Sequence, residues 1–167
     1  MKMRGGFTVV ELVITLTIMA ILMSLAVVNL SDTLAKGRDQ ERKTDVNNII
    51  IFQEAAYNRS TTRSYFTNTA ALSPGTVATI DTWYQNIDRN NLRAPGAVAG
   101  TYSVVAASNT TQTATGVLPQ PTNTTYVYQP IETDGSVCDT VGACRKFNIY
   151  YREESTGNVV MMTSRSQ

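Results

Sequence analysis

An apolar run begins with the stretch Gly5-Gly6-Phe7-Thr8-Val9-Val10-Glu11-Leu12 and continues to Leu30. The twenty-four residues from Phe7 to Leu30 would form an α-helix roughly 36 Å long, and the hydrocarbon core of a bilayer is about 30 Å thick. The run therefore predicts a membrane-spanning helix over residues 7–30. Because apolar side chains surround this helix, we expect it to be buried on all sides, in lipid or among copies of itself.

A short basic segment precedes the apolar run. Residues 1–6 contain Lys2 and Arg4 and end in two glycines. A secretory signal peptide has its small-residue cleavage site after the apolar segment, whereas here the small pair lies before it. A cut after Gly6 would therefore keep the hydrophobic helix in the mature protein. The basic residues also predict that this end stays in the cytoplasm and that the C-terminal part is exported.

Glu11 is the single charged residue of the apolar run. A charge near the bilayer centre costs about 3 kcal/mol on insertion scales and usually marks function. A cut after Gly6 would give Phe7 an α-amine that is largely cationic at neutral pH. In an assembly, the Glu11 of one copy can pair with the Phe7 amine of its neighbour. Because an unpaired charge in an apolar core costs about 3–5 kcal/mol, this pair would set the axial register. The alternative is a plain single-pass anchor whose glutamate extends toward water.

The N-terminal pattern resembles the class III leader and first helix of type IV pilins and their relatives. These relatives are the minor pilins, the pseudopilins of type II secretion and the competence pilins. The resemblance covers the first fifth of the chain and rests on the basic leader, Gly6, Phe7, Thr8-Val9-Val10, Glu11, Leu12 and the run to Leu30. It implies that a prepilin peptidase cuts between Gly6 and Phe7 and that the new Phe7 amine is methylated. It also implies that subunits leave the membrane at an inner-membrane assembly platform and pack into a filament.

Helical periodicity continues beyond Leu30. Residues 30–59 contain one glycine, Gly37, and no proline. Their apolar side chains fall at helical spacing, namely Val46, Ile49, Ile50, Phe52 or Gln53, and Ala56. We therefore expect one long helix over residues 7–59, ending near Tyr57, with an amphipathic second half. Many type IV pilins have a proline late in the apolar run, but this chain reads Ala26-Val27-Val28-Asn29, so we expect no kink there.

Residues 60–167, called the head below, are expected to form an exported globular part. Turn signals at Ser73-Pro74-Gly75, Ala94-Pro95-Gly96 and Pro119-Gln120-Pro121 divide this region. Alternation and β-propensity predict a short helix over residues 82–91 and strands over 101–106, 124–130, 146–152 and 159–163. The predicted fold class is α+β, a long helix packed on a small antiparallel sheet. The pilin resemblance implies the same ladle-shaped architecture.

Cys138 and Cys144 are the two cysteines of the chain, and both lie in the part expected outside the cell. An oxidising exterior and an even count favour a disulfide, whose short loop limits its stabilisation to roughly 2 kcal/mol. Structural zinc takes four ligands, and the chain has no histidine. The spacing also differs from the Cys-x-x-Cys of redox proteins. Asp134 and Asp139 flank the pair and predict either a calcium site, as in some pseudopilins, or two solvated turn aspartates.

Charge and composition argue against several functions. The chain has 14 basic and 13 acidic residues and a net charge of +1, so no strongly basic balance indicates a nucleic-acid partner. Two groups of basic residues could contact phosphates but are more simply interpreted as solvated faces. They are Arg38, Arg42 and Lys43 on the helix and Arg145 and Lys146 beside the cysteines. The absence of histidine removes the commonest general base. Without a phosphate loop or nucleophile elbow either, the sequence predicts no enzyme and no cofactor.

The sequence thus predicts a structural subunit of a type IV pilus, whose use can be adhesion, twitching motility, secretion or DNA uptake. Its expected partners are copies of itself, prepilin peptidase, the assembly platform and other minor pilins, with no nucleic acid required. We expect a single-pass protein of the cytoplasmic membrane that becomes an extracellular pilus. The alternative is a minor pilin or pseudopilin of a type II secretion or competence system. A third hypothesis is a membrane-anchored exported binding domain that never polymerises. Pilins at a filament tip often lack the glutamate, so Glu11 favours a position along the shaft.

Overall fold

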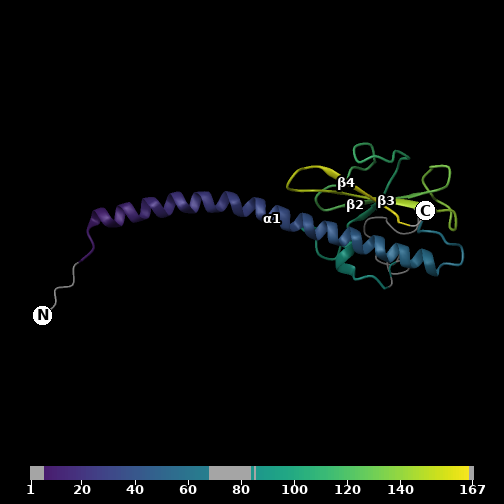
Figure 1. Cartoon of the computed structure of the whole chain (residues 1–167), viewed down its shortest axis with the longest axis horizontal. Coiled ribbons are helices and arrows are strands. Elements are labelled where there is room, and N and C mark those ends of the chain that lie inside the picture. Colours follow the sequence, from purple (N-terminus) through teal and green to yellow (C-terminus); the bar gives the residue numbers. More distant parts are fainter. Residues whose placement is uncertain (1–5, 68–83, 85, 166–167) are drawn as a thin grey trace. The chain divides into compact units, whose positions relative to one another are not determined.

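The computed structural model describes residues 6–67, 84 and 86–165, apart from the side chains of residues 26–29 (Figure 1). The chain divides into two compact units, Met1–Gly37 and Arg38–Gln167. The elements are α1 (Val9–Arg59), the 3-10 helix η1 (Arg89–Leu92), β1 (Val104–Ala106), β2 (Tyr126–Ile131), β3 (Lys146–Arg152) and β4 (Val159–Thr163).

Helix α1 confirms the prediction of one long N-terminal helix. It is continuous over 51 residues and passes through Gly37 and through residues 26–29 without a break. A chain without proline in this region keeps every i to i−4 hydrogen bond available, which explains the continuity. The helix ends at Arg59, where a turn begins and the Ser60 amide still donates to the Ala56 carbonyl at 2.9 Å.

The four strands form one mixed sheet in the order β1-β2-β3-β4. The α+β fold class is confirmed, and β3 and β4 coincide with the predicted strands. The prediction of a wholly antiparallel sheet is wrong for β1, which pairs parallel to β2, with Val104 opposite Tyr126. Parallel neighbours need a crossover of a dozen residues or more, and residues 107–125 supply it as an irregular segment. Alternation of side chains does not reveal strand direction, so the sequence pattern missed this pairing.

The core of the second unit lies between one face of α1 and one face of the sheet. Val46, Ile49 and Ile50 of α1 are buried, as their spacing predicts. They belong to the same cluster as Tyr126 and Phe147 of the sheet. The sequence left Phe52 and Gln53 open as the next inward position, and Gln53 is the fully buried one. Its amide nitrogen donates to the Tyr84 hydroxyl at 3.1 Å, so the helix presents a polar atom to the core.

Two predicted features of the head lie wholly or partly outside the described residues. The turn predicted at Ser73-Pro74-Gly75 lies wholly outside them. The helix predicted over residues 82–91 lies partly outside them, because most of its first half is not described. Within the described part of that helix, η1 is a single 3-10 turn capped by Asp88, whose carboxylate accepts from the Asn90 amide at 2.9 Å. The turn predicted at Ala94-Pro95-Gly96 is present, and the Ala97 amide donates to the Ala94 carbonyl at 3.0 Å.

Candidate assembly site at the entrance of the N-terminal helix

Thr8 and Glu11 close the first turn of α1 with reciprocal hydrogen bonds. The backbone amide and the hydroxyl of Thr8 donate to Glu11 Oε2 at 3.0 and 2.9 Å. The Glu11 amide in turn donates to Thr8 Oγ1 at 3.2 Å. This arrangement is a capping box, in which the N-cap threonine and the glutamate three residues later satisfy each other's backbone amides. Thr8-x-x-Glu11 is the sequence signature of that motif, so this role of Glu11 was readable from the sequence although the membrane argument did not use it.

Gly6 and Phe7 precede the cap and are accessible. Phe7 is 85% exposed, and a side-chain carbon added to Gly6 would meet no atom of the described residues within 4 Å. Both sides of the expected cleavage bond are therefore free of packing contacts in this part of the chain. Cleavage would leave the Thr8 amide and hydroxyl intact, so the capping box does not depend on the leader.

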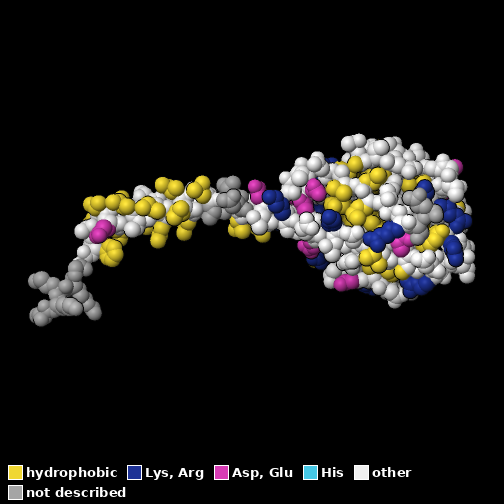
Figure 2. Space-filling model, viewed as in Figure 1, with side chains coloured by type: hydrophobic (Ala, Val, Ile, Leu, Met, Phe, Trp, Pro, Cys, Tyr) yellow, Lys and Arg dark blue, Asp and Glu magenta, His cyan; other side chains and the backbone are white. Residues whose placement is uncertain are grey.

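The first turns of α1 present apolar side chains on every side. All described side chains from Phe7 to Leu25 are exposed, including Leu12, Ile14, Ile18, Ile21, Leu22 and Leu25 (Figure 2). The hydroxyls among them are satisfied locally, since Thr15, Thr17 and Ser24 each donate to a carbonyl three residues earlier at 2.7–2.9 Å. The helix is long and apolar enough to cross a membrane. Such a surface needs lipid or other helices around it.

A buried ion network ties α1 to the turn between β3 and β4 within the second unit. Arg42, whose side chain is 1% exposed, contacts Asp39 at 2.8 Å and Glu154 at 3.0 Å. Arg38 contacts the other Glu154 oxygen at 2.6 Å. These two guanidiniums, Arg38 first, lower the pKa of Glu154 to about 2. The Glu154 and Ser155 amides donate to Asp39 at 2.7 and 3.0 Å, which locks the turn onto the helix.

The same network corrects the expectation that Arg42 lies on a solvated face of the helix. Arg42 is not part of a solvated face, because its guanidinium is enclosed and also donates to the Asn123 carbonyl at 2.9 Å. Its partner Asp39 is also buried. Burial alone would raise the pKa of Asp39, but its bonds to Ser155, Glu154 and Arg42 outweigh burial and lower it. Arg145 donates to the Thr62 and Arg63 carbonyls at 3.0 and 2.6 Å, so it holds a loop.

A further buried acid lies on the face of α1 that packs on the sheet. Asp45 is 6% exposed and accepts a hydrogen bond of 2.9 Å from the Tyr126 hydroxyl. Burial raises the pKa of Asp45 to about 6, against the lowering effect of the Tyr126 bond and with a further rise from nearby Glu41 and Asp88. No pattern in the sequence identified this residue, because its partner lies 81 positions away.

The predicted disulfide between Cys138 and Cys144 is present, with a Cα–Cα distance of 5.4 Å. Both cysteines are buried in the main core cluster. The Asp134 carboxylate accepts from the Ser136 amide at 2.9 Å and from its hydroxyl at 2.6 Å. These bonds lower the pKa of Asp134 and give it a role in the turn. Asp134 and Asp139 are exposed, and the described residues contain no group of three or more potential metal ligands.

Comparison with known families bears on the N-terminal region. Residues 1–27 match the family model of the prokaryotic N-terminal methylation motif. The chain has the class III leader and the long N-terminal helix of the type IV pilin family. No curated protein and no solved structure matches the chain significantly.

The matched region contains the residues that the sequence analysis singled out. The match supports a type IV pilin or pseudopilin in general, a family that is structural rather than catalytic. It includes Gly6, Phe7 and Glu11, the three residues singled out in the sequence, and the capping-box residue Thr8. The head lies beyond the matched residues, so its chemistry is argued from its own side chains.

Proposed function

We propose that this chain is a structural subunit of a type IV pilus filament. Prepilin peptidase removes residues 1–6, Phe7 becomes the methylated N-terminus, and the apolar helix holds the subunit in the cytoplasmic membrane until assembly. Residues 7–59 then provide the helical core of the filament, and the head, residues 60–167, forms its surface. Copies of the chain, the assembly platform and minor pilins are the partners of this process.

The observation that carries the proposal is the exposed apolar surface of α1 behind a pilin leader. A transmembrane anchor alone would account for the exposed side chains between Phe7 and Leu25. It would not account for a methylation motif or for a glutamate fixed at the helix entrance. A filament accounts for all three features. Helix-to-helix packing covers the apolar surface, the methylation motif marks the new N-terminus, and a charge at one position along the helix can set the axial register of neighbouring subunits.

Glu11 is suited to register neighbouring subunits even though it belongs to a capping box. The cap engages Oε2, and for Oε1 no hydrogen bond is found among the described residues. A carboxylate oxygen can accept further donors. The Phe7 amine of the next subunit can therefore approach Glu11 without breaking the first turn. An ion pair between the Phe7 amine and Glu11 would neutralise two charges that would otherwise be buried without a partner in the filament core.

A minor pilin or pseudopilin of a type II secretion or competence system is the second candidate. The methylation motif favours it as much as it favours a major pilin. The two differ in abundance, because a shaft subunit is present in many copies per fibre. Quantifying the chain in purified fibres against the other pilins of the cell separates them.

Replacing Gly6 tests the processing step. We expect Gly6→Val to block cleavage and to hold the full-length precursor in the membrane, because a branched side chain then occupies the cleavage position. The chain itself offers no steric obstacle to this side chain, so misfolding would not explain the result. Gly37→Ala is the matched control, since this glycine also has open space around it. Mature protein from Gly6→Val would show that the leader assignment is wrong.

A further inference from the structure

Strand β4 forms an open edge of the sheet in the head. It pairs with β3 on one side, and no strand of the described residues pairs with its other side. The Ser164 amide, just after β4, donates to the Phe147 carbonyl at 2.9 Å. Hydrogen-bonded positions alternate along an antiparallel ladder, so every second residue of β4 directs its backbone amide and carbonyl away from β3. These outward residues are Val159, Met161 and Thr163.

This edge lacks the features that usually keep sheet edges from pairing. Edge strands are commonly protected by charges, proline, bulges or very short length. Strand β4 consists of valine, methionine and threonine, and its register with β3 is unbroken over five residues. Met161 at its centre is 39% exposed. The opposite edge strand, β1, has three residues, and Val104 in it is 2% exposed. Of the two edges, β4 is therefore the one that suits a further strand.

The outward residues of β4 are arranged symmetrically about Met161. An antiparallel copy of β4 centred there places Val159 opposite the second Thr163, and Met161 opposite its own equivalent. Each of the resulting three pairs would exchange two backbone hydrogen bonds, so every outward amide and carbonyl finds a partner. A centre at Val160 would instead set Thr163 against the turn residue Gly157. The strand is therefore self-complementary in one register, as a two-fold interface requires.

We propose that β4 is the pairing surface for a second copy of this chain. Two heads join through antiparallel β4 strands into one continuous sheet. The charges beside the strand agree with this arrangement, because the register sets Arg165 of one copy beside the β3–β4 turn of the other, which carries Glu153. Arg165 is exposed, and the ion pairs of the described residues do not include it. Unlike charges thus meet at both ends of the paired strands.

This contact goes beyond filament assembly, because it uses the head and none of the apolar helix. A helical filament is built from heterologous contacts, whereas the β4 contact is two-fold. It therefore joins two dispersed chains or, if the proposed function holds, the heads of two neighbouring filaments that lie side by side. Each contact is small, but its repetition along two fibres strengthens the association through multivalency.

Cysteine cross-linking of the full-length chain in detergent micelles tests the register. The two native cysteines are bonded to each other, so an added cysteine supplies the free thiol. Met161→Cys places two thiols opposite each other on strands whose Cα atoms are about 5.5 Å apart, within the range of a disulfide. We expect oxidation to convert most of this variant to a covalent dimer.

Thr163→Cys is the matched control, because Thr163 is another exposed residue of the same strand. In the proposed register its equivalent in the second copy lies four residues along the strand, roughly 14 Å away, and out of reach of a disulfide. We expect at least about tenfold less dimer from this variant, since the cysteines cannot meet without breaking the register.

Charge substitution at Met161 tests the pairing without a covalent bond. Met161→Lys sets two lysines opposite each other, and like charges that face each other disfavour pairing. We expect co-purification of two differently tagged copies to fall at least about tenfold, and Met161→Glu to act in the same way. Mixing the two variants should restore co-purification, because unlike charges then face each other. Recovery on mixing also shows that both variants are folded.

Three results would overturn the proposal. They are no dimer from Met161→Cys, equal dimer from Thr163→Cys, and no recovery when the Met161→Lys and Met161→Glu chains are mixed. On fibres, we expect Met161→Lys to abolish side-by-side association in electron micrographs. Fibres of this variant that associate as the wild type does would also count against the pairing, whereas a wild-type chain that forms no fibres would count against the filament role alone.

Discussion

At the residue scale, Glu11 caps the helix and has, in the function that we propose, a second role in registering neighbouring subunits. Its position in an apolar run draws attention to its charge, but its geometry shows a helix cap closed with Thr8. An N-cap is worth about 1 kcal/mol. An unpaired charge in an apolar assembly costs about 3–5 kcal/mol. The two roles therefore differ enough in free energy to be separated by substitution.

Glu11→Gln separates them, because a capping box accepts glutamine at this position. The variant keeps the cap and loses the charge, so the Phe7 amine of the neighbour has no counter-ion. We expect processing to continue and fibre yield to fall by about a hundredfold, as the loss of roughly 3 kcal/mol per contact implies. Fibres are measured by shearing and immunoblotting.

Thr8→Val is the matched control for this experiment. It removes the hydroxyl that bonds to Glu11 at 2.9 Å but leaves the charge. We expect fibre yield close to wild type. Normal yield from Glu11→Gln, or an equal loss from Thr8→Val, would remove the registration role from the account.

Asp45 predicts a pH dependence of stability in the second unit. Its pKa of about 6 lies above the usual value near 4. The folded state therefore binds the proton more tightly than the unfolded state does. The stabilisation is complete below about pH 4 and is lost as the pH rises through about 6. Asp45→Asn keeps an acceptor for the Tyr126 hydroxyl and removes the charge. We expect it to raise the free energy of unfolding by on the order of 2 kcal/mol at pH 8 and to change it little at pH 4.

The measurement is thermal unfolding of the full chain in detergent micelles between pH 4 and pH 8. Asp139→Asn, which changes an exposed carboxylate, is the control. Glu154 acts in the opposite direction, because its pKa is lowered to about 2 and its stabilisation is lost as the pH falls. The comparison of Asp45→Asn with wild type at each pH cancels that effect. A difference that stays constant with pH would contradict the assignment to Asp45.

At the element scale, α1 and the sheet are joined by polar contacts as well as by the core. Arg42 and Asp39 hold the turn after β3 onto the helix, and Tyr126 of β2 reaches Asp45. These contacts fix the position of the sheet along α1. Apolar packing alone would define that position less sharply, because it is not directional.

Arg42→Met tests this connection. Methionine matches much of the apolar stem but leaves Asp39 and Glu154 without the guanidinium between them. We expect the free energy of unfolding to fall by about 3–5 kcal/mol, the usual cost of removing one partner of a buried ion pair. Chemical denaturation of the micellar protein measures it. Lys43→Met is the control, because Lys43 is the next residue and its side chain is exposed. It should change the free energy of unfolding by less than about 0.5 kcal/mol. Equal effects of the two substitutions would show that the ion network adds nothing to the free energy of unfolding.

Local patterns predicted the elements well and their distant partners poorly. Strands β3 and β4 follow from alternation around the turn at residues 153–158, and the inward face of α1 follows from the spacing of Val46, Ile49 and Ile50. The burial of Arg42 could not be predicted, because Glu154 lies 112 positions away and becomes a neighbour only in the folded chain. The parallel direction of β1 was missed for the same reason, since it depends on the path of residues 107–125.

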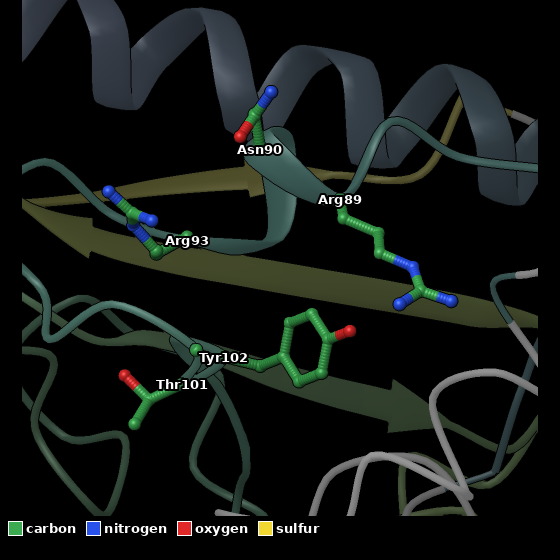
Figure 3. A pocket seen from close by; sticks show the side chains of 6 residues that line it. Arg89, Asn90, Arg93, Thr101 and Tyr102 are labelled. Atoms are coloured by element: carbon green, nitrogen blue, oxygen red, sulfur yellow. The ribbon is translucent and has the colours of Figure 1, made fainter.

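The family of the N-terminal region could be predicted from the sequence, because the information that identifies it is local. Gly6, Phe7 and Glu11 fall within six residues, and the resemblance to pilins rests on their register. A surface pocket between Arg93 of the loop after η1 and Tyr102 depends instead on the approach of residues 100–102 to η1 (Figure 3). Nothing in the spacing of those residues indicates a shared surface.

At the scale of the whole molecule, the two parts of the chain need different surroundings. The first part exposes apolar side chains on all sides and requires lipid or other helices. The second unit, Arg38–Gln167, has a buried core and a disulfide. In the function that we propose, lipid surrounds the first part before assembly and neighbouring helices surround it afterwards, and removal of the leader precedes this change.

The intact mass of the chain in sheared extracellular material, compared with its mass in membranes, tests this account most directly. We expect the sheared material to contain an abundant species that begins at Phe7 and carries one added methyl group, because processing must precede assembly. The membranes should contain the same species together with some precursor. An uncut chain that is confined to membranes would contradict the account, and the helix would then be an anchor for the head.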